Sequence, residues 1–196
     1  MIIDKFGPAK IDFKKLTITS LIFGFFLIPV HELGHVICDW MTGHPATMSY
    51  ARDRLLSGGE TPFLGLLGGP LLPLIISAFS VVQIYRQKNL SLFYPLAILG
   101  SFERLVLYIS GSLPSDERSL AAIVGWNMHS FQYIFLSLEV LLLFLVLLSF
   151  IRYKVHVKQA IFVFLIPLLS FFACAAIGVF VVERFVFPGQ FKIQFG

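Results

Sequence analysis

Long apolar stretches are the feature that most constrains how this chain folds. A helix needs about 20 mostly apolar residues to cross the hydrocarbon core of a bilayer. Five stretches of the sequence reach that length, at about residues 16–40, 62–85, 90–112, 131–151 and 160–182. The sequence therefore predicts an all-α polytopic membrane protein with about five transmembrane helices.

The composition agrees with lipid as the main solvent. Charged residues make up 13% of the 196 residues and hydrophobic residues 57%, whereas soluble domains carry roughly a quarter charged residues. The basic residues cluster between apolar stretches, which is typical of anchors at a lipid bilayer surface and not of a nucleic-acid-binding patch. Both cysteines, Cys38 and Cys174, lie within apolar stretches, so we expect buried thiols and no disulfide framework.

We expect one membrane-embedded domain over residues 1–196, with a core at about 16–127 and extra helices at about 131–182. The glycine- and proline-containing connection at 41–61 has a patch at 47–50 that favours extended backbone, which predicts a short β-hairpin after the first helix. The connection at 113–127 predicts a short helix over 116–124. No cleavable signal peptide is evident, because the first apolar stretch is long and has a polar centre.

The distribution of Lys and Arg predicts a cytoplasmic N-terminus in the plasma membrane. With that orientation the cytoplasmic side carries nine basic residues and the opposite side five, in agreement with the positive-inside rule. The nine are Lys5, Lys10, Lys14, Lys15, Arg86, Lys88, Arg152, Lys154 and Lys158; the five are Arg52, Arg54, Arg118, Arg184 and Lys192.

A His-Glu-x-x-His motif lies inside the first apolar stretch and points to metal chemistry. His31 and His35 are four residues apart, so on a helix they lie on one face, about 6 Å apart along the axis. Two imidazoles at that spacing can bind one Zn²⁺, and Glu32 can then act as general base on a metal-bound water. Three ionisable residues within five positions of an apolar stretch are costly unless they are paired or bind a metal. A polar contact between helices without metal is the alternative, and metal binding is favoured.

A zinc site needs a third protein ligand, and Asp116 and Glu117 are the strongest candidates. Both follow Pro114 at the end of an apolar stretch, where a loop can direct a carboxylate back into the bundle. Asp39 shares a helix face with the histidines but lies about 12 Å along the axis from His31, so a capping or supporting role is expected for it. Further possible ligands are Glu103, Glu139, His44 and His129. For Glu103 an intramembrane ion pair with Arg104 or another helix is favoured. Surface or interfacial positions are expected for His44, His129 and His156.

The sequence resembles the site-2 protease family of intramembrane zinc metalloproteases. Three segments carry the resemblance: the HELGH motif (31–35), the GGET turn (58–61) leading to LGGP (67–70), and LPSD (113–116). The resemblance implies a zinc metalloendopeptidase with ligands His31, His35 and Asp116, and with Glu32 as the catalytic base. The family commonly has a glycine after the aspartate, whereas Glu117 stands here.

The resemblance implies that the substrate is a transmembrane protein, cleaved in or near its membrane segment. A helical substrate hides its carbonyls in hydrogen bonds, so it must become locally extended before hydrolysis. The glycines of residues 65–70 predict either unwound backbone that pairs with the substrate or tight helix packing through small residues. Alternatives to a protease are a non-proteolytic zinc-dependent membrane hydrolase and a catalytically inactive homologue that binds membrane proteins. No sequence pattern specifies the oligomeric state.

Overall fold

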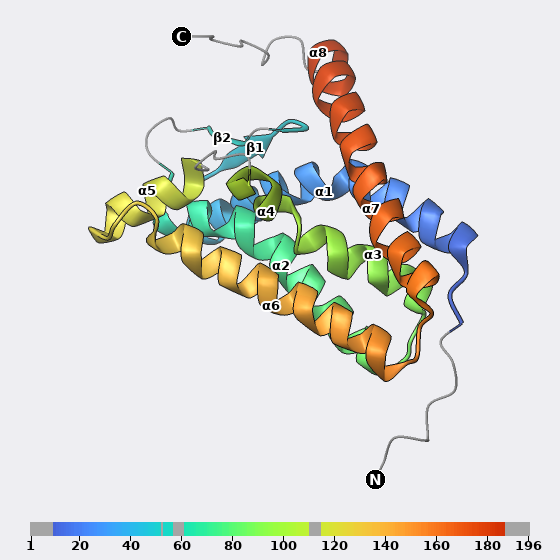
Figure 1. Cartoon of the computed structure of the whole chain (residues 1–196). Coiled ribbons are helices and arrows are strands. Elements are labelled where there is room, and N and C mark those ends of the chain that lie inside the picture. The colour runs from blue at the N-terminus through green and yellow to red at the C-terminus, as the bar shows by residue number, and fades with distance from the viewer. Residues whose placement is uncertain (1–9, 52, 57–60, 110–114, 187–196) are drawn as a thin grey trace.

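The computed structural model describes residues 10–51, 53–56, 61–109 and 115–186, and these form a helical bundle with one small hairpin (Figure 1). The elements in chain order are α1 (Phe13–Met41), β1 (Ala46–Met48), β2 (Asp53–Leu55), α2 (Phe63–Tyr85), α3 (Leu90–Gly100), α4 (Glu103–Ile109), α5 (Ser115–Val124), α6 (Ser130–Arg152), α7 (Val157–Ile177), a π-helical turn (Gly178–Val182) and α8 (Glu183–Val186). The predicted all-α polytopic architecture is confirmed.

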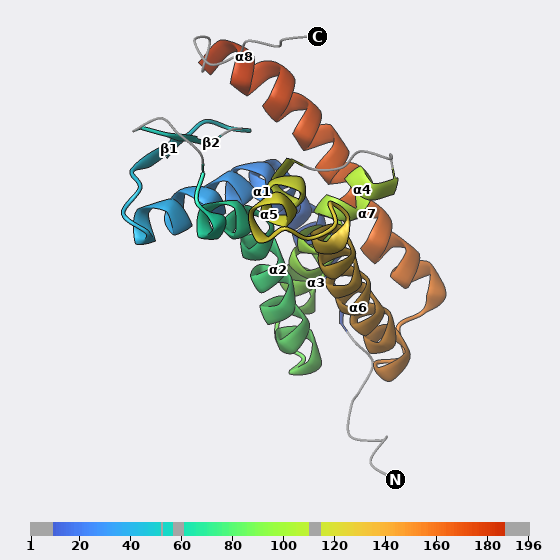
Figure 2. The same ribbon diagram turned by 90° about the vertical axis from the view of Figure 1, so that its left-hand side faces the viewer.

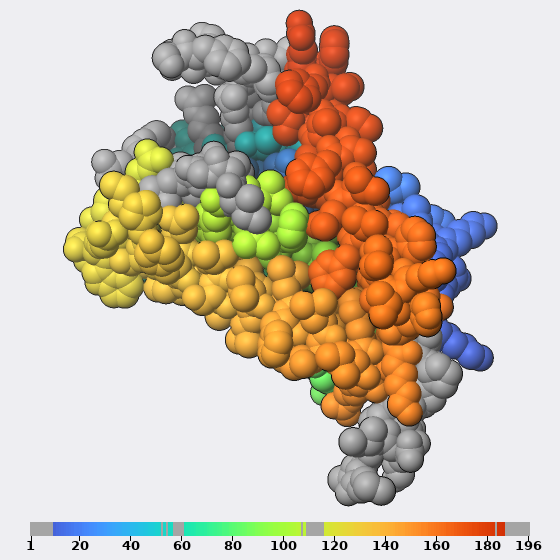
Figure 3. Space-filling view, in the orientation of Figure 1, coloured from blue at the N-terminus to red at the C-terminus, as the bar shows by residue number. Residues whose placement is uncertain are grey.

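Four helical segments of the described chain are long and apolar enough to cross a bilayer: α1, α2, α6 and the continuous stretch Val157–Val186. Large apolar side chains remain exposed on α6 and α7, which form much of the face toward the viewer in Figure 3. They include Tyr133, Leu141, Phe144, Ile161, Phe162, Leu169 and Phe172. Lipid tails are the natural covering for these faces, because water would not solvate so much apolar surface.

The prediction of one uninterrupted span at 90–112 is wrong. The chain leaves the helix after Gly100 and resumes it at Glu103, which gives the separate helices α3 and α4. The Ser101 hydroxyl hydrogen-bonds the Ser77 hydroxyl of α2, and Ser77 also donates to the Ala97 carbonyl at 2.7 Å. Hydropathy averaged over a spanning length does not reveal this break, since apolar residues dominate the stretch on both sides of it. Its consequence is that α4 begins with two charged residues, Glu103 and Arg104, inside the bundle.

Basic residues gather at one end of the bundle. At one end the Asp12 amide donates to Ser91 Oγ at 2.7 Å, and the Tyr153 hydroxyl donates to the Tyr85 carbonyl at 3.0 Å. These bonds bring together the starts of α1, α3 and α7 with the ends of α2 and α6 (Figures 1 and 2). Lys10, Lys14, Lys15, Arg86, Lys88, Arg152, Lys154 and Lys158 all lie in or beside these termini; Lys5 lies outside the described residues.

The predicted hairpin after the first helix is confirmed. Strands β1 and β2 pair antiparallel, with Ala46 opposite Leu55 and Met48 opposite Asp53. Ala46 and Leu55 pack on Val36 of α1, and the Trp40 indole donates to the Ala46 carbonyl at 2.9 Å. The hairpin is therefore held against the half of α1 that contains the His-Glu-x-x-His motif. The short helix predicted over 116–124 is also confirmed as α5.

Helices α1 and α2 cross through glycines, and their backbones touch. A Cβ atom added to Gly34 would collide with the Gly68 carbonyl, and one added to Gly68 would collide with the Gly34 carbonyl. Gly65, Gly68, Gly69 and Pro70 are all part of the helix α2. Of the two predictions for this segment, tight helix packing through small residues is therefore the one that the structure shows.

We predict that Gly34→Ala will destabilise the bundle, because its added methyl group meets backbone atoms that cannot rotate away. Overpacking of this kind costs about 1–3 kcal/mol, measurable as the free energy of unfolding in an SDS titration of the micelle-bound protein. Ala78→Ser, which adds one atom to an exposed position of α2, is the matched control. Equal stability of the two variants would contradict a close crossing of α1 and α2.

Candidate metal centre

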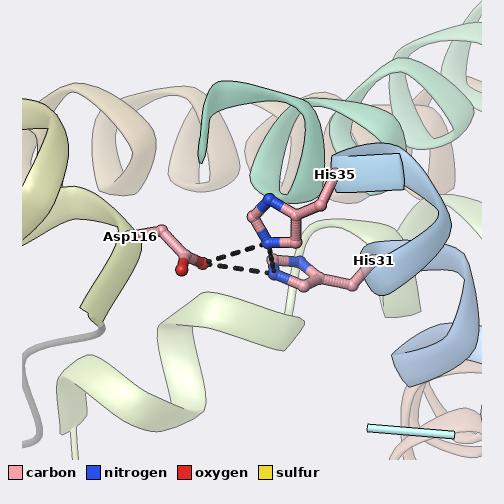
Figure 4. Close-up of side chains that lie close together, drawn as sticks. All are labelled: His31, His35 and Asp116. Atoms are coloured by element: carbon pink, nitrogen blue, oxygen red, sulfur yellow. Dashed lines mark hydrogen bonds and ion pairs between the residues drawn. The ribbon is translucent and has the colours of Figure 1, made fainter. Parts of the chain in front are cut away.

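Two imidazoles and one carboxylate meet between α1 and α5. His31 and His35 point from α1 toward Asp116 at the start of α5 (Figure 4). The two Nε2 atoms lie 3.1 Å apart, and Asp116 Oδ2 is 3.3 Å from His31 Nε2 and 3.5 Å from His35 Nε2. Two donors that each bind a tetrahedral zinc at about 2.0–2.1 Å lie roughly 3.3 Å apart. The three donor atoms are thus spaced as ligands of one ion.

Other groups hold both rings with Nε2 facing Asp116. His35 Nδ1 is 2.7 Å from the Gly65 carbonyl oxygen, and His31 Nδ1 is 3.3 Å from Glu103 Oε1. A carbonyl or carboxylate partner on one ring nitrogen fixes the proton there and leaves the lone pair of the other nitrogen for a metal. Glu103, one of the alternative ligands, therefore lies behind His31 and not with the three donor atoms.

Glycine in α2 makes room for the histidine pair. A Cβ atom on Gly69 would collide with the imidazoles of both His31 and His35. Both rings are nearly inaccessible, with exposed fractions of 6% and 3%. The helix crossing thus encloses the ligands of the candidate site as well as joining the two helices.

Glu32 lies on the hairpin side of α1 and is half-buried. Its carboxylate, His35 and Asp53 of β2 offer donor atoms that all lie within 4.8 Å of one another. Glu32 is therefore adjacent to the histidine that also belongs to the His31–His35–Asp116 group. A general base acting on a water at the candidate site would also have to lie close to the ligands.

The electrostatic surroundings are acidic and contain one guanidinium. Arg104 forms ion pairs with Asp116 and, at 3.5 Å from Nε to Oε1, with Glu117. Its backbone N–H donates to Glu139 Oε1 at 3.2 Å. One oxygen each of Glu103, Glu117 and Glu139 is buried without a hydrogen-bond partner among the residues that the structure describes.

These contacts gather more carboxyl groups than permanently charged basic side chains. Four carboxyl groups, from Glu103, Asp116, Glu117 and Glu139, lie around a single guanidinium among the ion pairs of the described chain. Burying unbalanced charge is expensive, so protons on these carboxyl groups or on the imidazoles, or a divalent cation among the ligand atoms, must balance it. The donor set of two imidazoles and a carboxylate also suits zinc.

Asp116 is poised to act as an anionic ligand. Burial by itself would raise the pKa of Asp116, but its contacts with His31 and His35 and the charge of Arg104 outweigh it and hold that pKa well below its usual range. The group is thus a carboxylate at neutral pH. Its position at the start of α5 also suits a negative charge, because a helix N-terminus carries partial positive charge.

The other residues considered as metal ligands from the sequence do not join the three donor atoms. Glu117 is fully buried and accepts a hydrogen bond from the Tyr108 hydroxyl at 2.9 Å. Asp39 is buried beside Gly65 and belongs to neither group of potential ligands in the described chain.

The other histidines lie outside these groups too: His44 follows α1, and His129 and His156 cap α6 and α7. Residues 58–60 and 113–114 of the resemblance lie outside the described residues.

Sequence reasoning missed the role of Arg104 and of the Gly65 carbonyl in the site. Arg104 was visible as a charged residue inside an apolar stretch, a signal that usually marks function in membrane proteins. The Gly65 carbonyl could not be found in this way, because every residue has one.

Comparison of the chain with protein-family models, with curated proteins and with solved structures gives no match. The chemistry of the site must therefore be argued from its own residues.

We predict that Glu103→Ala will weaken zinc binding about 10–100-fold, the usual cost of losing the partner that orients a histidine ligand. Glu103→Gln keeps an acceptor for His31 Nδ1 and should lose less. Titration of chelator-treated protein with zinc against a fluorescent indicator measures both. Unchanged affinity in Glu103→Ala would show that Glu103 does not orient the ligand.

Proposed function

We propose that this protein is an intramembrane zinc metalloprotease that hydrolyses a peptide bond in or near a transmembrane segment of a membrane protein. The observation that carries the proposal is the grouping of His31, His35 and Asp116 donor atoms beside Glu32, within helices that expose apolar surface. The resemblance to the site-2 protease family supports the same assignment.

Each residue of the candidate site has a separate role in the proposed reaction. His31, His35 and Asp116 would hold the zinc, which when bound lowers the pKa of a coordinated water to about 7 and polarises a carbonyl. Glu32 accepts the proton of the attacking water and then donates it to the leaving amine. Because Glu103 and the Gly65 carbonyl fix the rings, the ligands need no rearrangement during the reaction.

The hairpin is the element that best suits binding of the scissile segment. A substrate must be extended to offer its carbonyl, and extended peptides bind by pairing with exposed strand edges. Strand β2 contains Asp53, which lies with Glu32 and His35. A segment paired with this two-stranded sheet would run beside the proposed base.

The proposed orientation has the N-terminus in the cytoplasm. It is supported by the eight described basic residues at the end of the bundle where α1 begins, since Lys and Arg accumulate on the cytoplasmic side. The catalytic residues, on the second half of α1, then lie toward the opposite side of the membrane.

We predict that Glu32→Gln will retain zinc but cleave at least about 100-fold more slowly, the lower range of general-base contributions. His31→Ala, in contrast, should lose most of its zinc along with cleavage. Elemental analysis of detergent-purified protein gives the metal content, and incubation with transmembrane peptides, with and without a chelator, gives the activity.

Cleavage by Glu32→Gln at the wild-type rate would refute Glu32 as the base. Zinc-loaded wild-type protein that hydrolyses a soluble ester or amide but no transmembrane peptide would instead identify a non-proteolytic hydrolase. Zinc binding without any hydrolysis would identify an inactive binding protein.

A further inference from the structure

Arg104 contacts the same atoms that would bind the metal. Its Nη2 atom lies 2.7 Å from His31 Nε2 and forms an ion pair with Asp116 Oδ2. The side chain is buried, with an exposed fraction of 6% for the residue. Two of the three donor atoms of the candidate metal centre thus already have a cationic partner.

A metal at these atoms would lie beside the guanidinium. Arg104 Nη2 is 2.7 Å from His31 Nε2 and 3.4 Å from His31 Nδ1, so it packs against the imidazole ring as well as against the Asp116 carboxylate. A guanidinium has only N–H donors and keeps its positive charge in proteins. A zinc ion bound by His31 Nε2 and Asp116 Oδ2 would therefore lie close to a second positive charge, and the two cations would repel each other.

We propose that Arg104 is an internal competitor of the metal: its guanidinium holds the cation position between His31 and Asp116 and has to withdraw when the metal binds. This inference rests on the proposed metal centre and describes its regulation. The guanidinium balances part of the carboxylate charge until a divalent ion replaces it, and this competition weakens metal binding.

The structure offers a position for the withdrawn side chain. Glu117 Oε1 is 3.5 Å from Arg104 Nε, and Glu117 Oε2 is buried without a hydrogen-bond partner. Glu103 Oε2 is in the same condition. A rotation of the end of the side chain would exchange Asp116 for these carboxylates, so Arg104 remains paired in both states.

The test compares the zinc affinities of full-length wild type, Arg104→Gln and Arg104→Lys, each purified with zinc, stripped, and titrated with zinc against a chelating indicator. Glutamine removes the competing charge, so its zinc dissociation constant should fall roughly 10–100-fold, the equivalent of one charge-assisted hydrogen bond. Lysine keeps the charge without the planar fork and should give an intermediate value. Arg86→Gln removes one charge from the exposed end of α2 and should match wild type.

A merely structural role for Arg104 makes the opposite prediction, because a disordered site binds zinc more weakly. An affinity of Arg104→Gln equal to or below that of wild type overturns the proposal. If Arg104→Gln unfolds when stripped, Arg104→Lys decides, and an affinity no tighter than that of wild type overturns it. Zinc-loaded wild type that cleaves no transmembrane peptide would refute the proposed protease but leave this comparison intact, whereas failure of every form to bind zinc overturns the metal centre and the competition together.

Discussion

Charge balance in a water-poor interior is the constraint on which the arrangement of this protein depends. Carboxylates and imidazoles from α1, α4, α5 and α6 converge at one point of a bundle whose outer faces are apolar. Such groups are stable there only when they are paired or bind a cation. Arg104 supplies one positive charge, and the proposed zinc would add a divalent cation at the histidines. The chemistry that we propose uses this same balance, because groups that hold a divalent ion also orient a water molecule for attack.

Two features of the helices bring this cluster together: a close crossing and a helix break. The glycine crossing of α1 and α2 brings the helix axes so close that α2 offers the Gly65 carbonyl to His35 and leaves space at Gly69 for both rings. The break between α3 and α4 starts a new helix inside the bundle, which directs Glu103 and Arg104 at His31. Continuous helices of the same composition would present these charged side chains to lipid or to other helices.

The sequence was sufficient for the parts of the structure that depend on local pattern. Apolar length identified α1, α2, α6 and α7, and the spacing of His31 and His35 identified two of the three grouped donor residues. Asp116 was reached through its position after a proline and through family resemblance, and the structure brings it to the histidines. The break at Ser101 and the contacts of Arg104 could not be predicted, since they depend on how α2, α4 and α5 pack and not on any periodic pattern. The choice among Asp116, Glu117 and Glu103 likewise requires tertiary structure, because all three are carboxylates within or shortly after one apolar stretch.

X-ray absorption at the zinc edge, measured on metal-loaded protein in detergent, reports the ligands of the metal. We predict one zinc per chain with two imidazole nitrogens and light oxygen donors, all at about 2.0–2.2 Å, and the loss of most of the bound zinc in His35→Ala. A metal-free protein after zinc loading would contradict this prediction. So would a spectrum with sulfur at about 2.3 Å, which would assign the metal to a cysteine site.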